Sequence, residues 1–478
     1  MFRFVARARP CVALPKIKPP LLRPSYALAN TFALSTKHSS SRLPKKDLQF
    51  FDENEKQTNE KGAFKSFTMK LSEGEESAGQ FLKILHSADG DLKYMRYQQF
   101  SEVATLHFLR TVLKLPVPEA KIWINQDLGA AFCHRAVLMD FAEGIPASSA
   151  KEILQKDVVT RTRLTHSGWQ IEKRVSSFTF DRYGSIYRPS SDFMYEVPEG
   201  QKAKVLHGAS PEEKQLTESE FYIGRSCESM LFKGDDKHLM EEYHGPWTCA
   251  YDYVESRLRC QIECLSKKMN TPDNVDKSGT PYEYHIELLQ RALSIVPFIM
   301  PKDNDLTSPK LHHPVLSIDD LYVDEKFRVK TVIGWRSSWI GPAFASLNWA
   351  LKLTPGDEDL NPEKVIKQLK SKVSGEELGE LSQTLWEQSA MLRKALKEPI
   401  LPLLHIGLRT QRFGTLPLEV LLMHVKAHWK RFGAPVPCPY RITDEEIKMA
   451  NQKMDKFAEA GDKRVAKACM GVGLWTVV

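Results

Sequence analysis

The chain has 478 residues, of which 42% are hydrophobic and 27% charged, and its formal net charge is +7. This is the composition of an ordinary globular protein, and the length suffices for two lobes or for two or three domains with sizeable cores. No apolar run approaches the length of a membrane span, so we expect a soluble body without a membrane span. The eight cysteines form no CxxC pair, which argues against a zinc site.

The first 46 residues differ in charge from the rest of the chain. They contain ten Lys or Arg residues and no Asp or Glu. An Arg-rich, Ser-bearing and acid-free segment is typical of a mitochondrial presequence, so we expect residues 1–46 to be a presequence and the protein to be mitochondrial. The alternative is a disordered basic tail. Removing these ten positive charges from +7 leaves a net charge of −3, which argues against nucleic acid as a partner.

Short strand patterns and one helix pattern follow up to residue 145. Residues 47–62 are polar and charged and are predicted as a linker, and residues 63–145 as a β-rich lobe. Asp89-Gly90 predicts a turn into a further strand. Apolar residues at helical spacing after Ser101, a candidate N-cap, predict a helix. The predicted elements are strands within 66–71, 80–85, 91–97, 117–124 and 130–144 and a helix over 101–113.

From residue 146 to 478 the pattern is mainly helical, with one β-rich insert at 316–335. A β-rich lobe with one helix, followed by a helical lobe that carries a small hairpin, is the plan of the kinase-like fold. We therefore predict an α+β, two-lobed protein of protein-kinase-like fold. The strongest helical stretches are 210–270, 282–297, 361–396 and 416–432.

Short motifs support this prediction by their order and spacing: EG (73–74), SEVATLHFLRTVLKLPVP (101–118), YGSIY (183–187), FYIGRS (221–226), HGPW (244–247), HPVLSIDDLYVD (313–324), VIGW (332–335) and CPY (438–440). With them the chain resembles the fungal mitochondrial family of aminoglycoside-phosphotransferase-like proteins, the family of altered inheritance of mitochondria protein 9. The resemblance covers nearly all of the chain after residue 46. It implies the two-lobed fold and, from the family name, a role in mitochondrial inheritance or maintenance. We expect Tyr187 and Trp247 of these motifs to fill the core rather than to bind a ligand.

The resemblance places the groups for phosphoryl transfer in the segment 311–335, a degenerate catalytic hairpin. The reaction needs a carboxylate that orients the attacking hydroxyl, an Asn or Asp five residues later that holds magnesium, and a second Asp after the hairpin. His313 keeps the first motif position, but Val315 stands in place of the base and Gly334 in place of the second Asp. Asp320 replaces the Asn and is still an oxygen ligand. Because valine cannot accept a proton and glycine has no side chain to ligate a metal, two of the three groups are missing.

A shifted register does not restore these groups. Taking Asp319 or Asp320 as the base destroys the spacing to the hairpin and leaves His313 without a role. Asp324 is expected to begin the turn of the sequence DEKF, where Asp side chains bond nearby backbone amides. We also expect the single substitution Gly334→Asp to be tolerated.

The nucleotide-binding positions are also altered. The loop 73–79 keeps two glycines but carries three glutamates where anionic phosphates would lie. Lys93 or Arg96 is the candidate for the basic residue that grips the phosphates, and Glu102 is its candidate partner on the helix. The alternative role of Glu102 is that of an acid favoured in the first turn by the helix dipole. Asp140 matches the segment that links the two lobes, where backbone groups usually meet adenine.

These positions predict a pseudokinase that acts as a binding or scaffolding module for a mitochondrial protein or a small-molecule ligand, with no cofactor. The alternative is an ATP-dependent phosphotransferase that uses ATP and magnesium, acts on a small-molecule hydroxyl and works through Asp320. A third hypothesis is a structural relic whose cleft binds nothing.

Overall fold

The computed structural model describes most of the chain between residues 48 and 452. Several predictions fall on residues outside the described ranges: the presequence 1–46, most of the linker 47–62, the loop 73–79, the turn at Asp89-Gly90 and Val315. The described residues are 48–51, 65–71, 80–86, 92–124, 135–140, 142–189, 199–231, 241–271, 274–276, 279–314, 316–346, 361–396, 398–450 and 452.

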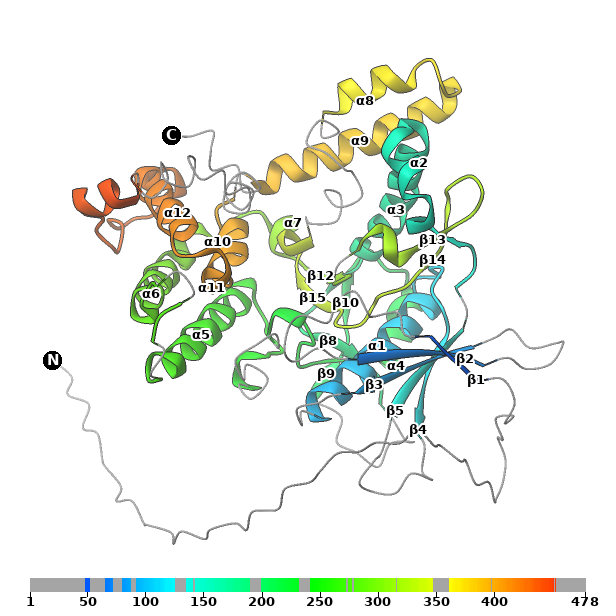
Figure 1. Ribbon diagram of the computed structural model, residues 1–478, viewed down its shortest axis with the longest axis horizontal. Coiled ribbons are helices and arrows are strands. Elements are labelled where there is room, and N and C mark those ends of the chain that lie inside the picture. Colours follow the sequence, from blue (N-terminus) through cyan, green and yellow to red (C-terminus); the bar gives the residue numbers. More distant parts are fainter. Residues whose placement is uncertain are drawn as a thin grey trace, which may run out of the picture. The chain divides into compact units, whose positions relative to one another are not determined.

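The N-terminal lobe is built on a five-stranded antiparallel sheet with the strand order β1-β2-β3-β5-β4 (Figure 1). The strand patterns predicted within 66–71, 80–85, 117–124 and 130–144 are thereby confirmed. β1 lies inside the segment 47–62, so the linker prediction is wrong for that part; four residues are too short a run to stand out before they pair with β2. The strands are β1 Leu48–Phe51, β2 Lys65–Leu71, β3 Gln80–His86, β4 Ala120–Ile124 and β5 Arg135–Asp140.

A single long helix, α1 (Leu92–Thr111), stands between β3 and β4 in the chain. It begins nine residues before Ser101, so the predicted strand at 91–97 and the N-cap at Ser101 are both wrong. The physical reason is local: the sequence LKYMRYQQF contains no Gly, Pro or β-branched residue, so nothing in it opposes helix formation.

The rest of the described chain is mainly helical. The helical stretches at 282–297, 361–396 and 416–432 are confirmed, whereas the stretch at 210–270 is interrupted by the strand β11 between α4 and α5. The helices are α2 Lys151–Lys156, α3 Val158–Ser177, α4 Pro211–Glu220, α5 Ala250–Met269, α6 Tyr282–Ile299, α7 Asn304–Thr307, α8 Pro362–Leu369, α9 Gly375–Leu396, α10 Ile400–Gly407, α11 Thr410–Phe413 and α12 Leu416–Ala427.

Short strands in this part form small sheets that connect the helices. β10 pairs with β7, β11 with β8 and β9, β12 with β15, and β13 with β14 and β6, all antiparallel. The strands are β6 Ile145–Pro146, β7 Thr179–Phe180, β8 Ser185–Tyr187, β9 Gly200–Lys202, β10 Val205–His207, β11 Tyr222–Gly224, β12 Pro309–His312, β13 Leu321–Val323, β14 Val329–Val332 and β15 Trp339–Pro342.

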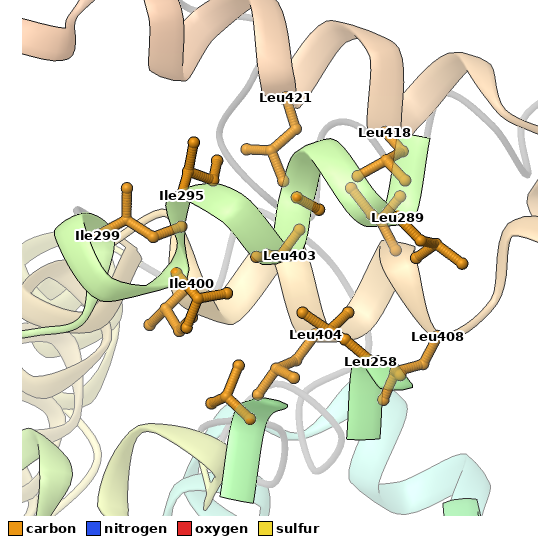
Figure 2. Packing of buried hydrophobic residues seen from close by; sticks show 14 of the residues in the cluster. Leu258, Leu289, Ile295, Ile299, Ile400, Leu403, Leu404, Leu408, Leu418 and Leu421 are labelled. Atoms are coloured by element: carbon orange, nitrogen blue, oxygen red, sulfur yellow. The ribbon is translucent and has the colours of Figure 1, made fainter. Parts of the chain in front are cut away.

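Two large apolar cores hold these elements. One core packs α1 and α3 against the hairpin strands β13 and β14. The other packs α5, α6, α10 and α12, and Figure 2 shows the side chains of α10 lying among those of α6 and α12. Each fully buried Leu or Ile contributes on the order of 1.5–3 kcal/mol. The labelled residues of this core are Leu258, Leu289, Ile295, Ile299, Ile400, Leu403, Leu404, Leu408, Leu418 and Leu421.

These elements have the order that the sequence predicts for a kinase-like protein: an antiparallel sheet with one helix, then a helical part that carries a small hairpin. The protein therefore has an α+β, kinase-like fold. Tyr187 is fully buried and Trp247 is 6% exposed in the core, so both fill the core as predicted. No helix in the described ranges is both long and apolar enough to span a lipid bilayer.

Candidate functional site

The degenerate catalytic segment follows strand β12 and folds into a short turn and a hairpin. After β12 ends at His312, a single 3-10 turn (Ile318–Asp320) leads into β13, and the chain returns along β14. β13 also pairs with β6, in the segment that follows the N-terminal sheet. This pairing holds the hairpin next to the connection between the sheet and the helical part.

Asp320 caps the turn that precedes β13. Its Oδ2 atom accepts hydrogen bonds from the backbone N and the Oγ of Ser317, at 2.9 and 2.8 Å. Its backbone carbonyl accepts a bond from Ile333 N at 2.9 Å, which joins the turn to the end of β14. The predicted metal ligand therefore also has a structural role, because its carboxylate completes a capping box.

His313 lies against the same end of the hairpin. Its Nε2 donates to the carbonyl oxygen of Ile333 at 2.8 Å. Its ring meets the ring of Trp335 edge to face, with 4.7 Å between the ring centroids. These contacts fix the orientation of the His313 ring and connect the segment after β12 to the residues that follow β14.

Gly334 approaches Asp320 so closely that a side chain at residue 334 would require the Asp320 carboxylate to move. Its φ of +85° lies in the region that favours glycine, and a Cβ built there lies 2.4 Å from Asp320 Oδ1 and 3.3 Å from His313 Cε1. The structure thus brings three of the four motif positions together, and the carboxylate of Asp320 fills the space for a side chain at 334. This geometry argues against the expectation that Gly334→Asp is tolerated.

Asp324 is a turn residue, as predicted. Its Oδ1 accepts from the backbone N of Lys326 and of Arg328, both at 2.9 Å, and its Oδ2 accepts from Arg328 Nε at 2.7 Å. These bonds fix the β13–β14 turn. Asp324 therefore belongs to the far end of the hairpin, away from the position where Gly334 meets Asp320.

The structure places both candidates for the basic residue of the nucleotide side on a helix rather than on a strand. Lys93 and Arg96 lie on α1, the same helix as Glu102, and not on a strand. At about 100° per residue, Lys93 and Glu102 lie about 180° apart around the helix, and Arg96 and Glu102 about 120° apart. Neither basic residue can therefore face Glu102 across the lobe. Glu102 is buried and is the eleventh residue of α1, so it is not an acid of the first turn.

Lys83 is a candidate site residue, judged by its strand position alone, that the sequence analysis missed. It lies on β3, opposite Thr68 of β2 and Val137 of β5. In kinases the lysine that holds the α/β-phosphates lies on a central strand of this lobe, and its acidic partner lies on the following helix. The signal in the sequence was the single lysine inside the apolar run QFLKIL.

Helix α1 is joined to the segment that follows the hairpin by buried polar contacts. Gln98 Nε2 donates to Ser337 Oγ at 2.5 Å, and Arg336 Nη2 donates to Gln98 Oε1 at 2.9 Å. Ser338 lies in the same segment, and its carbonyl accepts from Ser185 Oγ at 2.8 Å. The helix that carries Glu102 is thereby fixed to the chain just beyond Gly334.

Asp140 is the last residue of β5, where the sequence analysis places the connection between the lobes. Its backbone N donates to Glu119 O at 3.0 Å, and it stands opposite Gln80 of β3. Within the described ranges no three His, Cys, Asp or Glu side chains are grouped so that they could hold a metal ion.

Comparison with known proteins gives similarities at low identity. The chain is 26% identical over 268 residues to a subtelomeric hrmA-associated cluster protein of Aspergillus fumigatus, covering 52% of this chain and 51% of that protein. It is 24% identical over 249 residues to the mitochondrial altered inheritance of mitochondria protein 9 of Komagataella phaffii, covering 49% of this chain and 39% of that protein. The chain thus spans about half, or less, of the length of these curated relatives. A scan against models of protein families finds no match.

Solved structures align over more of the chain but with low scores. A choline kinase from Cryptosporidium parvum has a TM-score of 0.35 and 13% identity and covers 87% of this chain and 90% of its own. A Plasmodium vivax ethanolamine kinase has a TM-score of 0.31 and 10% identity and covers 79% of this chain and 82% of its own. In sequence, the chain is a distant homologue of the fungal altered inheritance of mitochondria protein 9 and of the subtelomeric hrmA-associated cluster proteins.

Proposed function

We propose that this chain is a mitochondrial kinase-like protein that has lost phosphotransfer and acts as a binding or scaffolding module. The observation that carries the proposal is the approach of Gly334 to Asp320, with 2.4 Å between a Cβ at residue 334 and Asp320 Oδ1. A magnesium ion bound at this hairpin needs near-octahedral oxygen ligands at about 2.0–2.1 Å. Gly334 has no side chain to complete such a set beside Asp320, and no three His, Cys, Asp or Glu side chains in the described ranges are grouped so that they could, so the residues present do not fit the metal.

The sequence at the base position supports the same proposal. Residue 315 is a valine, which offers no proton acceptor to an attacking hydroxyl. Without that carboxylate the attacking hydroxyl is not oriented, and without a side-chain ligand at Gly334 the magnesium that stabilises charge at the phosphates is held less well. Positioning and charge stabilisation account for most of phosphoryl-transfer catalysis.

Mitochondrial localisation is part of the proposal. It is supported by the acid-free basic segment 1–46 and by the word "mitochondrial" in the names of several relatives. The partner we propose is a mitochondrial protein or a small-molecule ligand, and a role in mitochondrial inheritance or maintenance follows from the names of these relatives.

The second candidate function is an ATP-dependent phosphotransferase acting on a small-molecule hydroxyl. Two observations favour it: Lys83 lies on the central strand β3, and Asp320 keeps its carboxylate at the hairpin. In this case Asp320 would have to leave its bonds to Ser317 in order to hold magnesium.

The experiment that separates the two functions measures transfer of labelled phosphate from ATP, with magnesium and a mitochondrial metabolite extract. We expect no labelled product from the purified chain. Turnover that Asp320→Ala abolishes and Asp319→Ala leaves unchanged would establish the phosphotransferase. Asp319 is a matched control because it is the exposed neighbour of Asp320 in the same turn.

A further inference from the structure

A cavity of about 550 Å³ opens on the helical part of the protein, away from the hairpin site. It lies at the Pro309 end of β12, whereas His313 follows the opposite end of that strand. Four residues of strand separate the two sites by about 13 Å. The cavity is lined by Thr179, Tyr183, Leu206, His207, Asn304, Asp305, Thr307, Ser308, Pro309 and Lys310.

Lys310 is a partly buried cation in this cavity. Its Nζ donates to Thr179 Oγ1 at 2.7 Å, and it forms no ion pair with any residue in the described ranges. Asp305, which also lines the cavity, is the acid whose charge acts on Lys310; its side chain is 91% exposed and lies 3.8 Å from Lys394. Burial lowers the pKa of Lys310, which Asp305 offsets only in part. A partly desolvated ammonium without a counter-ion is unfavourable, and an anion bound beside it would relieve that cost.

Apolar surface lies next to this cation. Tyr183 lines the cavity from within the core: it is only 3% exposed, and its hydroxyl donates to the carbonyl oxygen of Thr307. Leu206 is 49% exposed at the cavity, which leaves an apolar contact open to a ligand. Asn304 and His207 add donor groups to the lining. One cation beside an exposed aliphatic side chain matches a ligand with one charged end and an apolar body.

We propose that this cavity binds a small organic anion, a carboxylate or a phosphate monoester, whose charged group pairs with Lys310 and whose apolar body packs on Leu206. The volume lies within the range of about 300–1,000 Å³ that is usual for small-molecule sites. The proposal is independent of whether the hairpin site has lost phosphotransfer, because the two sites share no residue.

The test uses three probes of similar shape on the full chain: benzoate, phenyl phosphate and the neutral benzamide. Isothermal titration at pH 7 measures binding, and thermal unfolding measures stabilisation. We expect benzoate or phenyl phosphate to bind at least tenfold more tightly than benzamide. Which of the two anions binds more tightly identifies the charged group that the cavity prefers.

Variants assign the effect to Lys310. Lys310→Met should weaken binding of the preferred anion at least tenfold without lowering the melting temperature of the unliganded protein, because it removes a desolvated charge. Lys310→Arg keeps the charge and should retain binding. Lys330→Met, at the matching second position of β14, is the control and should bind like the wild type.

Three results would overturn the proposal. The first is equal affinity for benzamide and the anions, and the second is unchanged binding of the anion by folded Lys310→Met. The third is no binding of either anion up to about 10 mM, a concentration that corresponds to a binding free energy of only about 3 kcal/mol.

Discussion

Replacing Gly334 by alanine tests whether the hairpin has closed over the space of the missing carboxylate. The substitution forces a side chain into a φ of +85°, which costs about 1–2 kcal/mol. It also places a Cβ 2.4 Å from Asp320 Oδ1, and relieving such an overlap costs about 1–3 kcal/mol more. We therefore expect Gly334→Ala to lower the free energy of unfolding by about 2–5 kcal/mol, measured by urea denaturation at 25 °C.

Gly279 provides a matched control for the backbone part of this cost. Its φ is +82°, and a Cβ built there meets nothing within 4 Å. Gly279→Ala should therefore cost only the about 1–2 kcal/mol of the backbone. In an Asp320→Ala background the extra cost of Gly334→Ala should disappear. If Gly334→Ala lowers the free energy of unfolding no more than Gly279→Ala does, or if the extra loss persists without Asp320, then the Asp320 carboxylate does not fill the space for a side chain at residue 334.

Three further predictions concern other parts of the chain. Burial lowers the pKa of His312 to about 4 in the folded protein. Because the unfolded chain then binds a proton at a higher pH than the folded protein, the free energy of unfolding should fall by about 3 kcal/mol as the pH drops from about 6.5 to 4. In His312→Gln, urea denaturation across this pH range should show a loss smaller by that amount. Glu228 and Arg257 form an ion pair whose side chains are each 6% exposed, so Glu228→Gln should lower the free energy of unfolding by about 3–5 kcal/mol in urea denaturation. Glu255→Gln, in the more exposed pair with Arg259, should lower it by less than about 1 kcal/mol, and equal losses would contradict this prediction. A fluorescent protein fused behind residues 1–46 should enter mitochondria, and the chain without them should stay in the cytosol; import of the shortened chain, seen by microscopy, would refute the presequence.

The features that the sequence predicted are those set by local pattern. Short apolar runs between turn residues indicate β2 to β5 and the hairpin in the sequence. Asp324 bonds amides two and four residues later, so its role follows from adjacent sequence alone. The start of α1 was missed because the sequence Asp89-Gly90 before LKYMRY is compatible with either a strand or a helix after it.

The features that the sequence missed depend on approach between distant segments. The absence of a side chain at Gly334 was visible, but its contact with Asp320 across the hairpin was not. Lys83 could be recognised only once β3 was seen to lie between β2 and β5 in the sheet. The cavity at Lys310 joins β7, β10, α7 and β12, which span more than a hundred residues of sequence, and no motif marks it.

The most direct test of the proposed loss of phosphotransfer is binding of ATP with and without magnesium, followed by thermal unfolding of the full chain. A nucleotide at about a hundredfold excess over its Kd would stabilise the protein by about 2.7 kcal/mol, which a melting curve detects readily. Because the space for a second metal ligand is filled, we predict no magnesium-dependent rise in the melting temperature. A rise that requires magnesium, is lost in Asp320→Ala and is kept in Asp319→Ala would contradict the account.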